Sequence, residues 1–94
     1  IDHAPDFAAG YNGRATAYFL LGLYGPSLDD LRQTLVLEPR HFGAMRGLAV
    51  IFENLERPSE ALEVYQQVAD LNPADTDVQD AIARLETELE GQAL

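Results

Sequence analysis

The chain has 94 residues, of which 16 are acidic and six are basic, for a formal net charge of −10. This negative charge opposes the phosphate neutralisation that nucleic-acid binding requires, so the composition argues against a nucleic-acid partner. No cysteine is present, which excludes disulfides and cysteine-based zinc sites, and no apolar run approaches the roughly 20 residues of a membrane span.

The first predicted helix runs from about Asp6 to Leu21. Apolar and aromatic side chains recur at helical spacing along one side of it, and Asn12, Thr16 and Phe19 fall on another. Gly10 and Gly13 each weaken a helix by roughly 1 kcal/mol relative to alanine. We therefore expect either a close approach of backbone or ligand at these glycines, or close packing between helices.

Two further helices are predicted in the middle of the chain. The stretch from Gly22 to Gly25 interrupts the pattern, and a second helix follows from Pro26 to about Glu38, because proline suits the first turn of a helix. The third helix is predicted from about His41 to Leu55. Its apolar side carries Met45, Leu48, Ala49 and Phe52, and its neighbouring face carries Arg46, Val50 and Glu53.

A fourth helix is predicted from Pro58 to Leu71, and Asn72 and Pro73 then break the chain. The fifth runs from about Asp75 to Leu89. Its apolar stripe consists of Val78, Ile82, Leu85 and Leu89, and its other faces are acidic, as the solvated side of a terminal helix must be.

The pattern of the chain repeats every 34 residues. Pro5, Pro39 and Pro73 keep this spacing. The same step relates further positions along the chain, including Tyr11 with Met45, Ala15 with Ala49, Tyr18 with Phe52, Leu28 with Leu62 and Leu31 with Tyr65. A fixed period of this length is typical of stacked supersecondary units.

The spacing of Met45, Leu48, Ala49 and Phe52, followed by Ala61, Tyr65 and Pro73, resembles the tetratricopeptide repeat pattern. The resemblance implies an all-α fold of five helices, with antiparallel helix pairs stacked into a right-handed superhelix. It predicts one domain over residues 1–94, with repeat one at about 6–39, repeat two at about 40–73 and a capping helix at about 75–90.

Several positions depart from that pattern. Arg14 stands where leucine is usual, and Ser27 and Thr34 stand where small alanine is usual. Gln79 and Glu86 replace the two large residues in the last copy, which favours a lone capping helix there. The first three departures are expected to make repeat one only slightly more polar.

The resemblance also implies a concave face, lined by the first helix of each pair, that binds an extended peptide or a partner helix. The predicted partner-binding residues are Asn12, Thr16, Phe19, Arg46, Val50, Glu53, Asp80 and Arg84. Arg46 and Arg84 could grip a carboxylate bidentately, or could instead form ion pairs within the stack with Glu53 or Asp80. The family's chaperone-tail binders use lysines for a terminal carboxylate, and this chain has none.

The favoured function is a non-enzymatic module that binds a peptide or partner protein. The alternative is a structural or self-association module, a fragment of a longer array, in which contact with an upstream repeat or a second copy buries Phe7, Tyr11, Leu20 and Leu23. A homo-oligomer is therefore possible. A basic partner is easier to accommodate than an acidic one, since residues 51–94 hold eleven acids against two arginines.

No group of residues in the sequence matches a catalytic or metal-binding motif well, so no catalytic residue, metal site or cofactor is predicted. Asp75, Asp77, Gln79 and Glu86 resemble part of a calcium loop, but Asp80 stands where that loop needs glycine. His3 and His41 are isolated. Paired acids such as Asp29 with Asp30, or Glu86 with Glu88, are interpreted as solvated helix faces.

The ends and the source are only weakly indicated. The chain starts at Ile1, and its first five residues resemble the end of a preceding repeat, so we expect an upstream segment to have been removed. All six basic residues are arginine, a composition that hints at a bacterial genome rich in G and C. Localisation is unknown, with bacterial cytoplasm or periplasm as the options.

Overall fold

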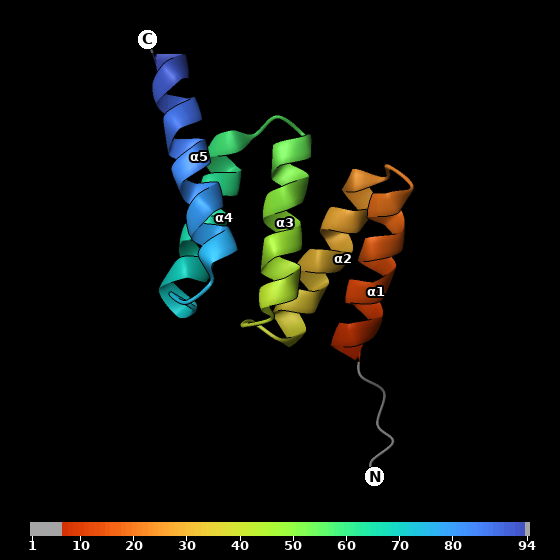
Figure 1. Cartoon of the computed structure of the whole chain (residues 1–94). Coiled ribbons are helices and arrows are strands. Elements are labelled where there is room, and N and C mark those ends of the chain that lie inside the picture. Colours follow the sequence, from red (N-terminus) through yellow and green to blue (C-terminus); the bar gives the residue numbers. More distant parts are fainter. Residues whose placement is uncertain (1–6, 94) are drawn as a thin grey trace.

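The computed structural model describes residues 7–93, which form five α-helices and no strand (Figure 1). The helices are α1 (Phe7–Leu20), α2 (Tyr24–Leu37), α3 (Phe42–Asn54), α4 (Pro58–Leu71) and α5 (Thr76–Ala93). The predicted all-α fold of five helices is thereby confirmed. Within the same residues, no helix is both long and apolar enough to cross a lipid bilayer.

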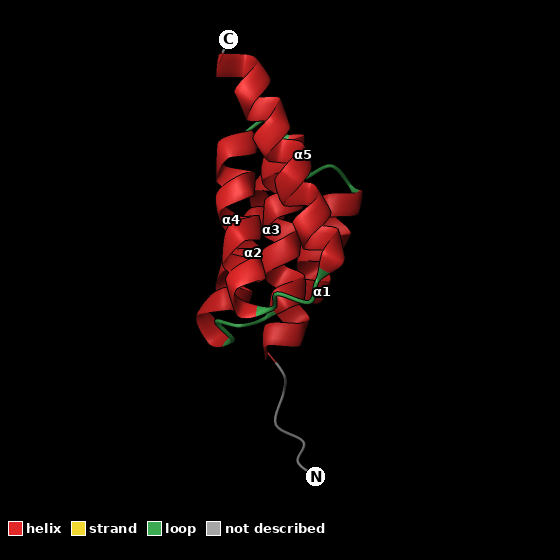
Figure 2. Ribbon diagram, turned by 60° about the vertical axis from the view of Figure 1, so that its left-hand side comes forward, coloured by secondary structure: helices red, strands yellow, loops and turns green. Residues whose placement is uncertain are grey.

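Successive helices run antiparallel and pack side by side, so the molecule is an elongated stack of 54 × 29 × 17 Å (Figures 1 and 2). The principal contacts join α1 with α2, α2 with α3, α3 with α4, and α4 with α5. The larger of two apolar clusters lies between α3, α4 and α5, around Phe52, Tyr65, Val68 and Leu85. The smaller lies between α1, α2 and α3, around Ala15, Leu31 and Ile51.

The two helix pairs turn in the same way. After α1, Gly22 adopts a positive φ of 76°, and the Leu23 N–H donates to the Tyr18 carbonyl at 2.8 Å. After α3, Glu56 adopts a positive φ of 60°, and the Arg57 N–H donates to the Phe52 carbonyl at 2.8 Å. Each residue of the second turn lies 34 positions after the matching residue of the first turn. The backbone conformation therefore repeats with the same period as the sequence.

The helix starts follow from local hydrogen bonding. α2 begins at Tyr24, two residues before the predicted start, because the Leu23 carbonyl already accepts the Ser27 N–H at 3.1 Å. Pro26 therefore lies within the first turn, where its missing N–H costs nothing. His41 caps α3 by accepting the Ala44 N–H on Nδ1 at 3.0 Å, and Asp75 caps α5 by accepting the Val78 N–H at 3.2 Å.

The fifth helix buries one stripe against α4. Val78, Ala81 and Leu85 are buried there, and Ile82 and Leu89 are half-buried, in agreement with the predicted stripe. α5 continues to Ala93, four residues past the predicted end. No proline follows Leu89 to stop it, and a single glycine at Gly91 is tolerated in a helix.

Candidate functional site

A pocket of about 210 Å³ lies between α1, α2 and α3. Ten residues from these three helices line it: Asn12, Ala15, Thr16, Phe19, Ser27, Leu31, Gly43, Gly47, Val50 and Ile51. None of the ten carries a formal charge, in a chain where 23% of residues do. The pocket is therefore a neutral site on an acidic protein.

Two glycines of α3 help to keep this space open. A Cβ added at Gly47 would lie 3.4 Å from Cδ1 of Leu31, and one added at Gly43 would lie 3.3 Å from Cε1 of His41. Any larger side chain at Gly47 would extend into the pocket and against Leu31. The apolar wall opposite is formed by Phe19, whose ring packs on that of Tyr24 with a centroid distance of 5.4 Å.

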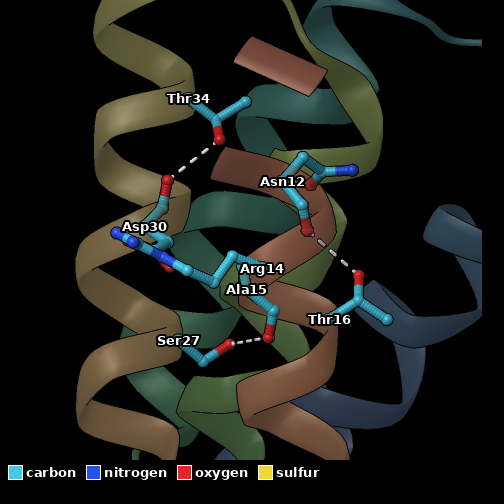
Figure 3. A network of polar contacts seen from close by, with 7 residues as sticks. All are labelled: Asn12, Arg14, Ala15, Thr16, Ser27, Asp30 and Thr34. Carbon is cyan, nitrogen blue, oxygen red and sulfur yellow. Dashed lines mark hydrogen bonds and ion pairs between the residues drawn. The ribbon is translucent and has the colours of Figure 1, made fainter. Parts of the chain in front are cut away.

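The polar side chains at the pocket differ in how many hydrogen-bond donors and acceptors remain free for a ligand (Figure 3). The Ser27 hydroxyl donates to the Ala15 carbonyl at 2.7 Å, which ties α2 to α1, and the Thr16 hydroxyl donates to the Asn12 carbonyl at 3.1 Å. Both hydroxyl protons are thus engaged. The side-chain amide of Asn12 has no hydrogen bond within residues 7–93, so its N–H and C=O groups remain able to bind a ligand backbone.

The structure brings together four of the eight residues predicted to bind a partner. Asn12, Thr16, Phe19 and Val50 all line the pocket. The other four, Arg46, Glu53, Asp80 and Arg84, lie outside it on α3 and α5. Asp80 is exposed on α5.

Both arginines of that second group form ion pairs between helices. Arg84 donates to Glu53 at 2.7 Å, which is one of the two ion-pair partners considered for it from the sequence. Arg46 donates to Asp75 at 3.2 Å, a partner that the sequence did not suggest. Each arginine side chain remains about half exposed, and each links α3 to the segment that forms or caps α5.

Glu53 is the centre of a network that joins three helices. Its carboxylate accepts hydrogen bonds from Arg84 and from the hydroxyl of Tyr65, the latter at 2.8 Å. The hydrogen bond from Arg84 lowers the pKa of Glu53, although its partial burial acts in the opposite direction. Burial, together with the hydrogen bond to Glu53, raises the pKa of Tyr65, so this hydroxyl stays protonated as a donor.

The sequence interpretation was wrong about Asp30, which is not solvated. Its side chain is buried on α2, and Arg14 of α1 donates two hydrogen bonds to it, at 2.7 and 2.8 Å (Figure 3). The hydrogen bonds from Arg14 lower the pKa of Asp30 well below its usual range, in spite of burial. Glu86 and Glu88, the other acidic pair, are exposed as predicted.

The Arg14 guanidinium also lies beside two aromatic rings. Its central carbon is 5.6 Å from the centroid of Tyr11 and 5.8 Å from that of Tyr18. A guanidinium in this position is attracted by the negative faces of both rings. One signal in the sequence could have revealed the pair, because the positions 34 residues on from Arg14 and Asp30 are Leu48 and Val64, which are both apolar.

Comparison with known proteins supports the repeat assignment. The chain matches no family model. It is 38% identical over 87 residues to a TPR repeat-containing protein of Rhizobium etli, and the match covers 93% of this chain and 43% of that protein. The chain thus spans less than half the length of the curated relative that it matches.

Two solved structures share the fold. The first TPR of Spaghetti bound to an HSP90 peptide superposes with a TM-score of 0.80 at 20% identity, over 88% of this chain and 68% of that one. A point mutant of MamA gives a TM-score of 0.77 at 24% identity, over 93% of this chain and 64% of that one. These likenesses establish the fold of two helix pairs followed by a fifth helix.

Proposed function

This chain is built of tetratricopeptide repeats, and we propose that it is a non-enzymatic binding module whose pocket between α1 and α3 takes one uncharged side chain of an extended peptide. The observation that carries the proposal is the neutral pocket of about 210 Å³, lined by Phe19, Val50 and eight other uncharged residues. Pockets that combine apolar walls with a few polar groups are the usual form of a recognition site.

Asn12 is the residue best suited to bind the backbone of such a peptide. Its amide offers both donors and an acceptor, and its own chain makes no use of them within residues 7–93. An apolar side chain held between Phe19 and Val50 would then be fixed in register by hydrogen bonds from Asn12. In this arrangement Phe19 and Val50 anchor the peptide by one side chain, and Asn12 sets the orientation of its backbone.

The charges around the pocket favour a peptide that is neutral or basic near its anchor. Arg46 and Arg84 are each engaged with a carboxylate of their own chain, so gripping an acidic ligand would require these ion pairs to break. The net charge of −10 further opposes an acidic ligand. The peptide bound to the first TPR of Spaghetti contains the acidic run Glu-Glu-Val-Asp, and we expect this chain not to bind it.

The proposal is tested with an array of immobilised 15-residue peptides in which one central position is varied through apolar, acidic and basic side chains. The Spaghetti ligand peptide is included as an acidic reference. We expect the chain to bind peptides with an apolar centre and neutral or basic flanks, and to ignore the acidic reference.

Two variants locate the binding. Gly47→Leu fills the pocket, and Val50→Glu places a charge at its partly exposed edge with little risk to folding. The matched control is Arg46→Gln with Arg84→Gln, which alters the neighbouring ion pairs and leaves the pocket lining intact. Binding that is lost in both pocket variants and kept in the control supports the proposal. Binding that survives in Val50→Glu and Gly47→Leu, or an array that stays blank, refutes it.

A further inference from the structure

The pocket between α1, α2 and α3 has one buried polar side chain, that of Ser27. It lies at the inner end with Ala15 and Ile51, and each of the three is 1% exposed. Thr16 and Val50, which also line the pocket, are exposed at its mouth. The Ser27 hydroxyl donates its proton to the Ala15 carbonyl (Figure 3). Because a hydroxyl oxygen has two lone pairs, it can still accept a hydrogen bond from a ligand.

The second repeat folds without a hydroxyl at the matching position. The residue 34 positions after Ser27 is Ala61, which is fully buried on α4. Ala15 lies inside α1, so its carbonyl accepts a backbone N–H of the helix whether or not residue 27 is a serine. The hydroxyl of Ser27 therefore gives the pocket an acceptor that the second repeat does without.

In the second repeat, the space that corresponds to the pocket holds a ring of the chain itself. Leu31 and Phe19 form two walls of the pocket. The residues 34 positions after them are Tyr65 and Glu53. The buried Tyr65 donates its hydroxyl proton to the Glu53 carboxylate at 2.8 Å, so its phenol ring spans the distance between the two matching positions. Leu31 is too short to do the same, and the pocket remains between α1 and α3.

The size and the walls of the pocket suit a ring of this kind. A cavity of about 150 Å³ with apolar walls is enough to hold benzene. The pocket has about 210 Å³, which leaves room for a ring that carries one hydroxyl, and Gly47 adds no side chain to reduce it. The ring of Phe19 lines the pocket, and paired aromatic rings attract each other beyond the area that they bury.

We infer that the side chain taken up by the pocket is a tyrosine, with its ring against Phe19 and its hydroxyl donating to Oγ of Ser27. The inference rests on the proposed function, because it names the side chain that the bound peptide inserts. The contact repeats, between two molecules, the one that Tyr65 makes within this chain. Phenylalanine fills the same space but has no proton to donate, and leucine lacks the ring.

An NMR titration of the isotope-labelled chain tests the inference with three small probes, the N-acetyl amide derivatives of tyrosine, phenylalanine and leucine. The backbone N–H signals of Ala15, Ser27, Gly47 and Ile51 report that the pocket is occupied. We expect the tyrosine derivative to bind about fivefold more tightly than the phenylalanine derivative, which is the effect of one hydrogen bond. The leucine derivative should bind most weakly.

Ser27→Ala separates the effect of the hydrogen bond from that of the space. The tyrosine derivative should lose its fivefold advantage in this variant, whereas the phenylalanine derivative should bind as it does to the wild type. Thr87→Ala is the matched control, because it removes another hydroxyl that donates to a carbonyl four residues earlier, on α5 and outside the pocket. The control should keep the preference for tyrosine. Thermal melting followed by circular dichroism verifies that both variants are folded.

Two results would overturn the inference and leave the proposed function intact. One is a leucine derivative that binds the pocket as tightly as the tyrosine derivative. The other is a preference for tyrosine over phenylalanine that is absent from the wild type or that survives in Ser27→Ala. If no derivative shifts the reporter signals, the inference fails as well, and the peptide array then decides separately on the proposed function.

Discussion

Arg14 and Asp30 of the first repeat form an ion pair at the two positions where the second repeat has Leu48 and Val64. One repeat therefore uses a charge pair where its sequence copy uses two apolar side chains. The exchange is paired, because either charge without the other would leave an uncompensated group at the interface of α1 and α2.

The paired exchange predicts unequal effects of single and double substitution. Arg14→Leu leaves the buried Asp30 carboxylate without a counter-charge, so we expect the melting temperature to fall by roughly 5–10 °C. Arg14→Leu with Asp30→Val restores the composition of the second repeat and should melt within a few degrees of the wild type. Thermal melting of the wild type, the single variant and the double variant tests this order of stabilities.

The control for this experiment is Arg57→Leu. It removes an exposed ion pair with Glu60, whose atoms are 3.6 Å apart, and surface pairs of this kind contribute little. A double variant as unstable as Arg14→Leu would contradict the prediction.

The ion pair of Arg14 with Asp30 also makes the stability of the fold depend on pH. The pKa of Asp30 is lower in the folded chain than the ordinary value of about 3.9, so between these values the unfolded chain binds more protons. The stabilisation is therefore complete above about pH 4 and is lost as pH falls through the folded pKa. Melting from pH 7 to pH 2 should show the wild type losing more stability below about pH 4 than the Arg14→Leu, Asp30→Val chain. Parallel curves for the two chains would count against this role of Asp30.

Removal of the Tyr65 hydroxyl should weaken the joint between α3, α4 and α5. Tyr65→Phe removes a hydrogen bond to Glu53 but retains the buried ring, so we expect a loss of about 1 kcal/mol in the free energy of unfolding. Urea denaturation measures this loss as a lower midpoint concentration, and the dependence of the free energy of unfolding on urea concentration should keep the same slope. Tyr18→Phe is the control, since the Tyr18 ring contacts Arg14 through its face, and it should change stability by less than about 0.5 kcal/mol.

The two turns with positive φ predict changes of opposite sign. Gly22→Ala introduces a Cβ at φ 76° and should destabilise the chain by about 1 kcal/mol. Glu56→Gly relieves a side chain held at φ 60° and should stabilise it by a similar amount. Urea denaturation of both variants tests the pair, and equal shifts in one direction would show that the turns are not equivalent.

Most of the fold could be predicted from the sequence, because each helix buries a stripe of apolar side chains that recur at helical spacing in its own sequence. The predicted third and fourth helices match α3 and α4 to within one residue. The start of α2 was missed because it depends on the Leu23 carbonyl, a backbone group with no side-chain signature. The end of α5 was missed because the apolar stripe ends at Leu89, whereas the helix continues through Gly91 to Ala93 without an apolar residue to mark it as far as Gln92.

The site was less readable, because its charges find partners far along the chain. Arg14, Arg46 and Arg84 pair with acids 16, 29 and 31 residues away. Local spacing cannot select among so many carboxylates. The uncharged members of the set, Asn12, Thr16, Phe19 and Val50, line one pocket, and they were found from the sequence because the resemblance to the tetratricopeptide repeat indicated which side of each first helix to consider.

The order of packing, with each helix set mainly against its neighbours in the chain, also bears on how the molecule folds and opens. Contacts between near neighbours close short loops, which favours rapid folding. A linear stack can also open from an end without disrupting the rest. The amides of α1 should therefore exchange with solvent deuterium sooner than those of α3 and α4, and the proposed pocket would open whenever α1 detaches.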